Sequence, residues 1–189
     1  MIVPNLLLVA GTGTKSGKTS MICRIIEDFS YLDITAIKIT PHFHETTTGL
    51  ELISEEKGYA IYEETGMDSS KDTSRMLRSG AHKVYFAKVW DDQLYDVFRK
   101  IMENVGANTP VICESPALRN FVEPGVFIIM ISETVDKYKN ISHLESLPHV
   151  MIKLEELKSI DTLPFGFEGG RWSYLPPVPP FRDFSLKGD

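Results

Sequence analysis

Gly11-Thr12-Gly13-Thr14-Lys15-Ser16-Gly17-Lys18-Thr19 is the stretch of sequence that decides the fold. Residues 5–10 precede it as a continuous apolar run, which is typical of a strand buried on both faces of a parallel sheet. Residues 18–29 follow it with apolar side chains at helical spacing. Strand, glycine loop and helix in this order predict a phosphate-binding loop (P-loop).

The loop contains each residue type that a triphosphate requires. Gly13 and Gly17 allow the tight backbone path that turns N–H groups toward an anion, Lys18 supplies a point charge, and Thr19 supplies a hydroxyl for Mg²⁺. The start of the helix adds its positive dipole end. We therefore predict a Mg²⁺-bound nucleoside triphosphate, GTP or ATP, held by Gly13, Thr14, Lys15, Ser16, Gly17, Lys18, Thr19 and Ser20.

The loop departs from the strict P-loop pattern at one position. That pattern places a glycine five residues before Gly17, where this chain has Thr12, and Gly11 lies one residue earlier. In this phasing the loop is similar to that of dethiobiotin synthetase and related ATP-dependent ligases. Lys15 does not occupy the position of the extra lysine in MinD-like ATPases, so we interpret it as a solvated lysine and leave open whether the protein is a homodimer.

The rest of the chain alternates expected strands and helices, which predicts an α/β fold: a P-loop three-layer sandwich with a mainly parallel sheet, in a single domain of residues 1–189. Residues 45–70 are expected to be an inserted loop or small hairpin outside the main sheet. Residues 161–189, rich in proline and aromatic residues, are expected to be an irregular tail. The expected strands are 33–39, 82–89, 111–113, 126–131 and 150–152, and the expected helices are 70–78 and 90–105.

Composition limits the classes of function. The 189 residues carry a formal net charge of -6, so nucleic acid is an unexpected partner. The apolar start at residues 2–10 is too short to cross a bilayer, so we expect neither a signal peptide nor a membrane anchor, and a cytoplasmic location. Cys23 and Cys113 form no CxxC pair and are expected to be reduced and internal.

Three segments together resemble the MobB family, GTP-binding accessory proteins of molybdopterin-guanine dinucleotide biosynthesis. Besides the loop, residues 36–44 (AIKITPHFH) resemble that family's Ile-Lys-His-x-His-His strand end, and residues 70–81 (SKDTSRMLRSGA) resemble its Lys-Asp-Ser segment. Cys113-Glu114-Ser115 falls where the family has Val-Glu-Gly. The order agrees over about the first 130 residues, although the chain is longer than the family between His44 and Lys71.

The resemblance implies site roles. Lys18 and Glu114 would be catalytic, and Thr19, Glu114 and Asp72 would surround Mg²⁺, with Glu114 acting through water. A carboxylate at a strand's carboxyl end also suits a hard cation on chemical grounds. For Asp72, a helix N-terminal carboxylate is an equally good interpretation. Candidate substrate-binding residues are Lys38, His42, His44, Lys71 and Arg75; the charged residues could equally be solvated, and the histidines could be ordinary loop residues.

Three functions fit these residues. The first is a MobB-like protein of a divergent subgroup that hydrolyses GTP or ATP slowly and assists a partner protein in molybdenum cofactor or other metallocofactor assembly. The second is a small-molecule kinase or an ATP-dependent ligase related to dethiobiotin synthetase. The third is a non-enzymatic, nucleotide-controlled binding module with residues 42–70 as its partner surface. The Asn/Thr-Lys-x-Asp guanine motif is absent, so the sequence leaves the base open.

Overall fold

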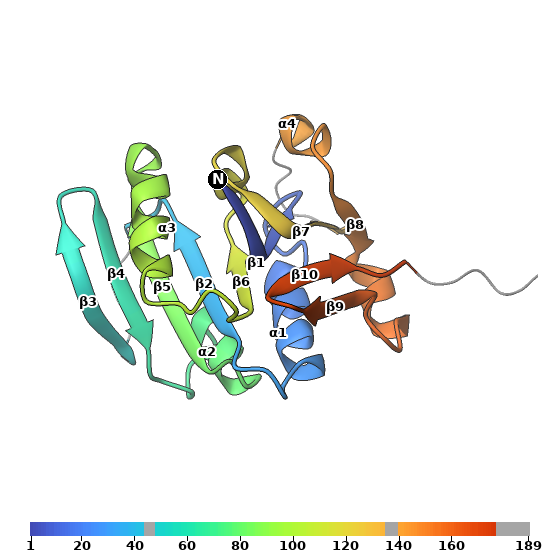
Figure 1. Ribbon diagram of the computed structural model, residues 1–189, viewed down its shortest axis with the longest axis horizontal. Coiled ribbons are helices and arrows are strands. Elements are labelled where there is room, and N and C mark those ends of the chain that lie inside the picture. Colours follow the sequence, from blue (N-terminus) through green and yellow to red (C-terminus); the bar gives the residue numbers. More distant parts are fainter. Residues whose placement is uncertain (44–47, 135–139, 177–189) are drawn as a thin grey trace, which may run out of the picture.

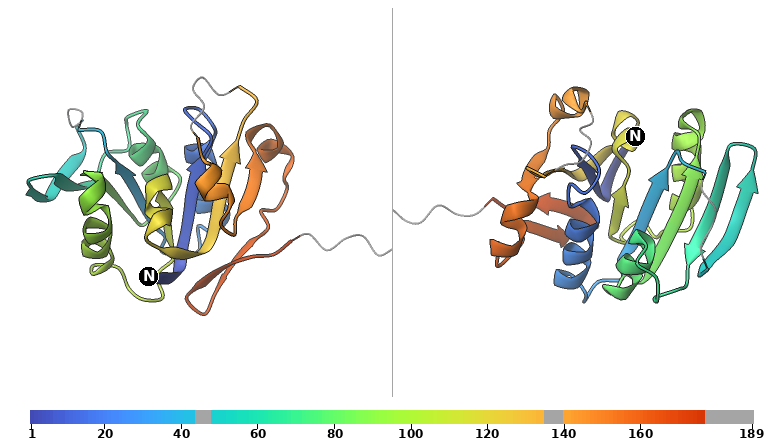
Figure 2. Two further views of the ribbon diagram at one scale, coloured as in Figure 1. Left: turned by 90° about the horizontal axis from the view of Figure 1, so that it is seen from above. Right: turned by 180° about the vertical axis from the view of Figure 1, so that it is seen from behind.

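The computed structural model describes residues 1–43, 48–134 and 140–176, which form a mixed sheet with helices packed on both faces (Figures 1 and 2). The strand order of this eight-stranded sheet is β3-β4-β5-β2-β6-β1-β7-β8. From β5 to β8 every neighbouring pair is parallel. The strands are β1 (Ile2–Gly11), β2 (Thr35–Thr40), β3 (Leu50–Glu56), β4 (Tyr59–Glu64), β5 (Lys83–Val89), β6 (Val111–Glu114), β7 (Glu123–Ile131) and β8 (Val150–Lys153).

Strand β1 lies inside the sheet between β6 and β7. Its residues Leu6 to Ala10 are completely buried. Because helices cover both faces, side chains pointing to either face need to be apolar, which explains the unbroken apolar run. Parallel pairing on both sides brings the carboxyl ends of β6, β1 and β7 to the same edge of the sheet, where the glycine loop begins.

The helices complete a three-layer α/β fold. One face carries α1 (Lys18–Asp28), α2 (Asp72–Arg78) and the 3₁₀ helix η3 (Leu154–Ser159). The opposite face carries α3 (Leu94–Met102), which follows the short turn η1 (Asp91–Gln93), together with η2 (Pro116–Asn120) and α4 (Ser142–Glu145). The predicted fold class, an α/β sandwich with a mainly parallel sheet between helical layers, is confirmed. Within the described ranges, no helix combines the length and apolar character needed to cross a membrane.

The hairpin expected within residues 45–70 exists, but it is not separate from the main sheet. Strands β3 and β4 pair antiparallel, and β4 also pairs antiparallel with β5, so the hairpin extends the sheet at its edge. The physical reason is burial, because Tyr59 and Ile61 of β4 join the core on the α3 face. Residues 44–47, which include the start of this predicted segment, lie outside the described residues.

The expectation of an irregular tail is wrong for residues 165–174. Strands β9 (Phe165–Glu168) and β10 (Arg171–Tyr174) form an antiparallel hairpin. Trp172, at 1% exposure, packs against Phe29 with ring centroids 5.2 Å apart, and its Nε1 donates to the carbonyl oxygen of Val111 at 3.2 Å. Burial of this indole therefore holds the hairpin against the sheet. Residues 177–189 of the predicted tail lie outside the described part of the chain.

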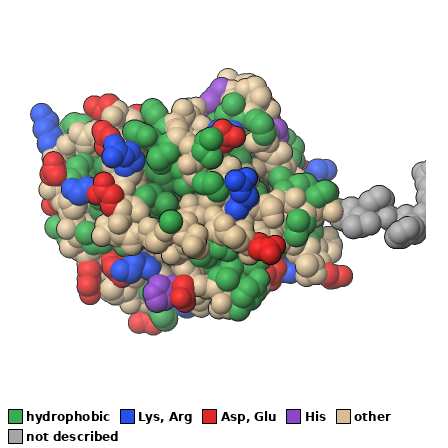
Figure 3. Space-filling model, in the orientation of Figure 1, with side chains coloured by type: hydrophobic (Ala, Val, Ile, Leu, Met, Phe, Trp, Pro, Cys, Tyr) green, Lys and Arg blue, Asp and Glu red, His purple; other side chains and the backbone are tan. Residues whose placement is uncertain are grey.

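The face seen in Figure 3 carries acidic and basic side chains interspersed among apolar and uncharged surface. This mixture agrees with the modest net charge of -6. A ligand with several negative charges would therefore depend on a local arrangement of donors rather than on a broad field.

Candidate functional site

The glycine loop contains two residues with left-handed backbone conformation. Gly17, at the N-terminus of α1, has φ of 89°, and Lys15 has φ of 62°, the left-handed region that favours glycine. A Cβ atom at position 17 would lie 2.6 Å from Cδ1 of Leu154. Glycine is therefore required at position 17 both by its backbone conformation and by close packing.

Gly11 explains the departure from the strict P-loop pattern. It is the last residue of β1, and a Cβ atom there would overlap the hydroxyl oxygen of the buried Ser16. The next residue, Thr12, is anchored through its backbone N–H, which donates to the carbonyl oxygen of Met130 in β7 at 3.0 Å. Close approach of the returning loop thus requires glycine one residue earlier than the strict pattern has it.

The side chain of Lys18 reaches back to the glycine loop that precedes it. Its Nζ donates to the carbonyl oxygen of Gly13 at 3.0 Å and to the hydroxyl of Ser16 at 3.4 Å. Ser16 Oγ also donates to the same carbonyl, at 3.0 Å. The loop therefore holds an ammonium group and the N-terminus of α1 side by side, two features that favour an anion.

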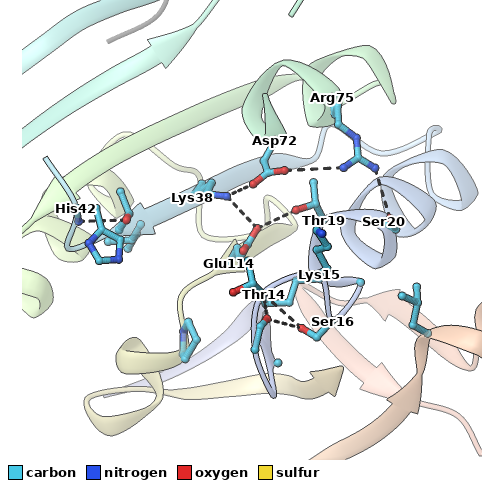
Figure 4. Close-up of a pocket in the computed structure, with 18 of the residues that line it drawn as sticks. Thr14, Lys15, Ser16, Thr19, Ser20, Lys38, His42, Asp72, Arg75 and Glu114 are labelled. Carbon is cyan, nitrogen blue, oxygen red and sulfur yellow. Dashed lines mark hydrogen bonds and ion pairs between the residues drawn. The ribbon is translucent and has the colours of Figure 1, made fainter. Parts of the chain in front are cut away.

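Glu114 ends β6 and is 7% exposed. Its Oε2 accepts a hydrogen bond from Thr19 Oγ1 at 3.3 Å and lies 3.6 Å from Nζ of Lys38, which comes from β2 (Figure 4). Since β6 lies between β1 and β2, strand order alone brings these three side chains together. A hydroxyl and a carboxylate meet here as oxygen ligands suited to Mg²⁺.

Asp72, the first residue of α2, lies between two cations. It forms an ion pair with Lys38 Nζ, and its Oδ1 is 3.8 Å from Nη1 of Arg75 (Figure 4). Burial by itself raises the pKa of the Asp72 carboxyl, but Lys38, the Thr19 hydroxyl and Arg75 together outweigh burial and leave that pKa below its usual value. Asp72 is therefore ionised at neutral pH. Arg75 also donates from Nη2 to the hydroxyl of Ser20 at 3.4 Å.

These side chains line one cavity of about 740 Å³. It includes the predicted loop residues, the predicted acids and three of the five candidate substrate residues. Lys71 is not among its lining residues, because it precedes α2 and is exposed, and His44 lies outside the described residues. The predicted residues that the cavity brings together are Gly13, Thr14, Lys15, Ser16, Gly17, Lys18, Thr19, Ser20, Lys38, His42, Asp72, Arg75 and Glu114.

Leu154 lines the same cavity and was not predicted. It follows β8, and β8 pairs parallel with β7, so its carboxyl end lies at the edge of the sheet that carries the loop. A strand was expected at residues 150–152, so the rule that ligands bind beyond the carboxyl ends of parallel strands could have pointed to Leu154. Pro41 and Pro116 border the cavity in the same way, after β2 and β6.

His42 belongs to no metal site within the described residues, and His44 lies outside them. His42 lines the cavity, and its backbone N–H donates to Thr40 Oγ1 at 3.2 Å. Among the described residues, no group of three or more histidine, cysteine, aspartate and glutamate side chains is arranged to hold a metal ion. Oxygen donors at Thr19, Glu114 and Asp72 lie beside the phosphate loop, and they fit an ion that also takes oxygens from a bound phosphate.

Comparison with known proteins leaves the family open. No family model matches the chain. No curated protein matches it either. Among solved structures, the chain is similar to the "apo" form of LpxK from Aquifex aeolicus in complex with ATP, with 12% sequence identity and a TM-score of 0.47. The alignment covers 89% of this chain and 52% of the LpxK chain, so this chain spans about half the length of that relative. A likeness at this level carries no argument about activity.

Proposed function

We propose that this protein binds a Mg²⁺-complexed nucleoside triphosphate and hydrolyses it slowly. The observation that carries the proposal is the meeting of Lys18 and Thr19, at the start of α1, with the buried Glu114 of β6. An ammonium, a hydroxyl and a strand-end carboxylate beside a glycine loop are the groups that phosphoryl-transfer sites use.

Each group has a distinct task in this proposal. Backbone N–H groups of residues 13–19 and the Lys18 ammonium bind the phosphates and stabilise the charge that develops on the transferred phosphoryl. Thr19 and Glu114 would hold Mg²⁺, directly or through water, and Asp72 is the second acid available to it. The metal ion supplies neutralisation of phosphate charge. Glu114 also orients water at the strand end.

The binding step is tested by isothermal titration of the protein with Mg-GTP and with Mg-ATP. We expect binding by the wild type and a loss of at least about tenfold in affinity for Lys18→Ala, because a charged hydrogen-bond donor to phosphate is removed. Lys57→Ala is the matched control, since Lys57 lies at the β3–β4 turn and does not line the cavity. Absence of binding by the wild type, or equal binding by Lys18→Ala, overturns the proposal.

A second candidate function is phosphoryl transfer to a small anionic acceptor. It is favoured by the cavity's extension beyond the phosphate loop to Thr40, Pro41 and His42, and by the cations Lys38 and Arg75 among its lining residues. Product analysis with candidate acceptors distinguishes the two. Formation of only inorganic phosphate and a nucleoside diphosphate supports hydrolysis, whereas a phosphorylated acceptor supports transfer.

A role in metallocofactor assembly rests on the resemblance of the three sequence segments to MobB.

A further inference from the structure

Lys38 lies between the two carboxylates that are available to a metal ion. Its Nζ forms an ion pair with Asp72 and lies 3.6 Å from Oε2 of Glu114, the oxygen that also accepts a hydrogen bond from Thr19 (Figure 4). A magnesium ion bound directly by carboxylate oxygens needs them at about 2.0 to 2.1 Å. An ammonium group that bridges Asp72 and Glu114 therefore competes with the metal ion for the same two acids.

The fold fixes the position of Lys38 between these acids. Lys38 of β2 and Glu114 of β6 are paired residues of neighbouring parallel strands, so their side chains leave the sheet on the same face. Asp72 begins α2, which packs on that face. Because the side chain of Lys38 is only 20% exposed, its charge depends on the two carboxylates for neutralisation.

The charge balance of the cavity also disfavours a metal ion that enters alone. Among the lining residues that the structure describes, lysine and arginine outnumber the carboxylates: the cations are Lys15, Lys18, Lys38 and Arg75, and the carboxylates are Asp72 and Glu114. A divalent cation therefore meets an excess of positive charge. A triphosphate reverses this balance, adds oxygen ligands for the ion, and offers Lys38 another anionic partner within the same cavity.

We infer that Lys38 makes metal binding conditional on the nucleotide, an inference that rests on the proposed nucleotide-binding function. In the free protein the ammonium group neutralises Asp72 and Glu114 and excludes the divalent ion. When a triphosphate enters, its charge attracts Lys38, and the two carboxylates become available to the metal. Because the two binding events are linked, the metal ion raises nucleotide affinity by the same factor as the nucleotide raises metal affinity.

Binding of Mn²⁺, followed by electron paramagnetic resonance, tests the inference, because Mn²⁺ takes the same oxygen ligands as Mg²⁺. The full chain is titrated at about pH 8, far above the ordinary pKa of a carboxyl group, with and without non-hydrolysable analogues of ATP and GTP. For the metal alone, Lys38→Met should bind Mn²⁺ at least about tenfold more tightly than the wild type, because a positive charge between the acids is removed. Lys38→Gln, a second neutral variant, should show the same gain. The analogues should raise Mn²⁺ affinity more in the wild type than in either variant.

Three control variants separate the position of Lys38 from its charge. Lys38→Arg keeps the charge and should exclude Mn²⁺ as the wild type does. Lys71→Met removes a charge beside Asp72 in the sequence but outside the cavity lining, so it should leave Mn²⁺ affinity unchanged. Arg75→Met removes a cation 3.8 Å from Asp72 but leaves Lys38 between the acids, so its gain in Mn²⁺ affinity should be smaller than that of Lys38→Met.

The outcomes distinguish this inference from the proposed function. If the neutral Lys38 variants, shown to be folded by circular dichroism, bind Mn²⁺ no more tightly than the wild type while the analogues still bind, the inference is overturned and nucleotide binding stands. Equal gains in Lys38→Met and Arg75→Met also overturn it, because net charge and not the position of Lys38 would then control the metal. If the wild type binds neither analogue in the presence of Mn²⁺, the proposed function fails, and the inference fails with it.

Discussion

Thr19 and Glu114, 95 positions apart in the sequence, are joined by a hydrogen bond from Oγ1 to Oε2 at 3.3 Å. The contact unites the start of α1 with the end of β6, the two elements from which P-loop sites take their hydroxyl and acid. Its geometry requires only that β1 and β6 be neighbours in the sheet, and they are.

Glu114→Gln should separate binding from turnover. Glutamine keeps the size of the side chain and accepts from Thr19, so nucleotide affinity should change little. Loss of the negative charge should lower kcat by about a hundredfold, the effect typical of removing one electrostatic group from an active site. Titration with Mg-ATP and Mg-GTP gives affinity, and phosphate release gives kcat. Equal losses in both would instead mean that Glu114 supports the structure of the site.

The ion pair of Asp72 with Lys38 predicts a pH dependence. Because the pKa of Asp72 is lowered in the folded protein, its contribution to stability is present above the unfolded carboxyl pKa and is lost as pH falls through the folded value. Urea unfolding between about pH 6 and pH 3 should show a smaller loss of stability for Asp72→Asn than for the wild type. An equal loss of stability with falling pH in both proteins would contradict the lowered pKa of Asp72.

Lys38→Met gives a direct check on the cause of that shift. Burial of Asp72 is then opposed only by Thr19 and Arg75, so the pKa of its carboxyl should rise relative to the wild type. Carboxyl NMR titration measures it. Lys83→Met is a suitable control, because Lys83 pairs with Glu63 at 3.3 Å and not with Asp72. An unchanged Asp72 pKa in Lys38→Met would show that the ion pair does not set it.

Gly17→Ala should cost more stability than Gly80→Ala. Both glycines have positive φ, 89° and 103°, which costs an alanine about 1 kcal/mol. A Cβ at Gly80 meets nothing within 4 Å, whereas at Gly17 it meets the Leu154 side chain at 2.6 Å. Urea unfolding of the two variants measures the difference, and nucleotide titration should show lost affinity only for Gly17→Ala. Equal losses of stability in the two variants would indicate that the Leu154 side chain moves away from the new Cβ atom without an energetic cost.

The meeting of the loop with Glu114 and Asp72 in one cavity could be predicted, the loop from adjacent residues and the two acids from the resemblance of their segments to the MobB family. Lys18 and Thr19 follow a glycine and a buried strand, and Glu114 ends another buried strand. Such local signals need no knowledge of pairing partners. The expected α/β class followed from the same alternation of strands and helices.

Local signals alone do not place Leu154 or the β9–β10 hairpin, because both depend on pairings between distant residues; for Leu154 the expected strand at residues 150–152 gave a partial signal. Leu154 reaches the loop only because β8 pairs with β7, and Trp172 is ordered by Val111 and Phe29. The proline-rich residues after Tyr174 also led to the prediction of irregular structure for the tail. The extension of the sheet by β4 was missed for the same reason, since its partner β5 lies beyond α2.

Trp172 should be among the most costly residues to truncate outside the cavity. Its side chain is 1% exposed and packs edge-on against Phe29, and its indole N–H donates a hydrogen bond to the carbonyl oxygen of Val111. Trp172→Ala should therefore lower the free energy of unfolding by about 3 to 5 kcal/mol. Trp90→Ala is the matched control, because Trp90 is 46% exposed, and it should lower the free energy of unfolding by about 1 kcal/mol or less. Urea unfolding followed by circular dichroism compares them. The hairpin packs at Phe29, after the end of α1, whereas Lys18 begins that helix, so the folded Trp172→Ala variant should bind nucleotide as tightly as the wild type. A loss of nucleotide affinity in a variant that circular dichroism shows to be fully folded would instead link the hairpin to the loop.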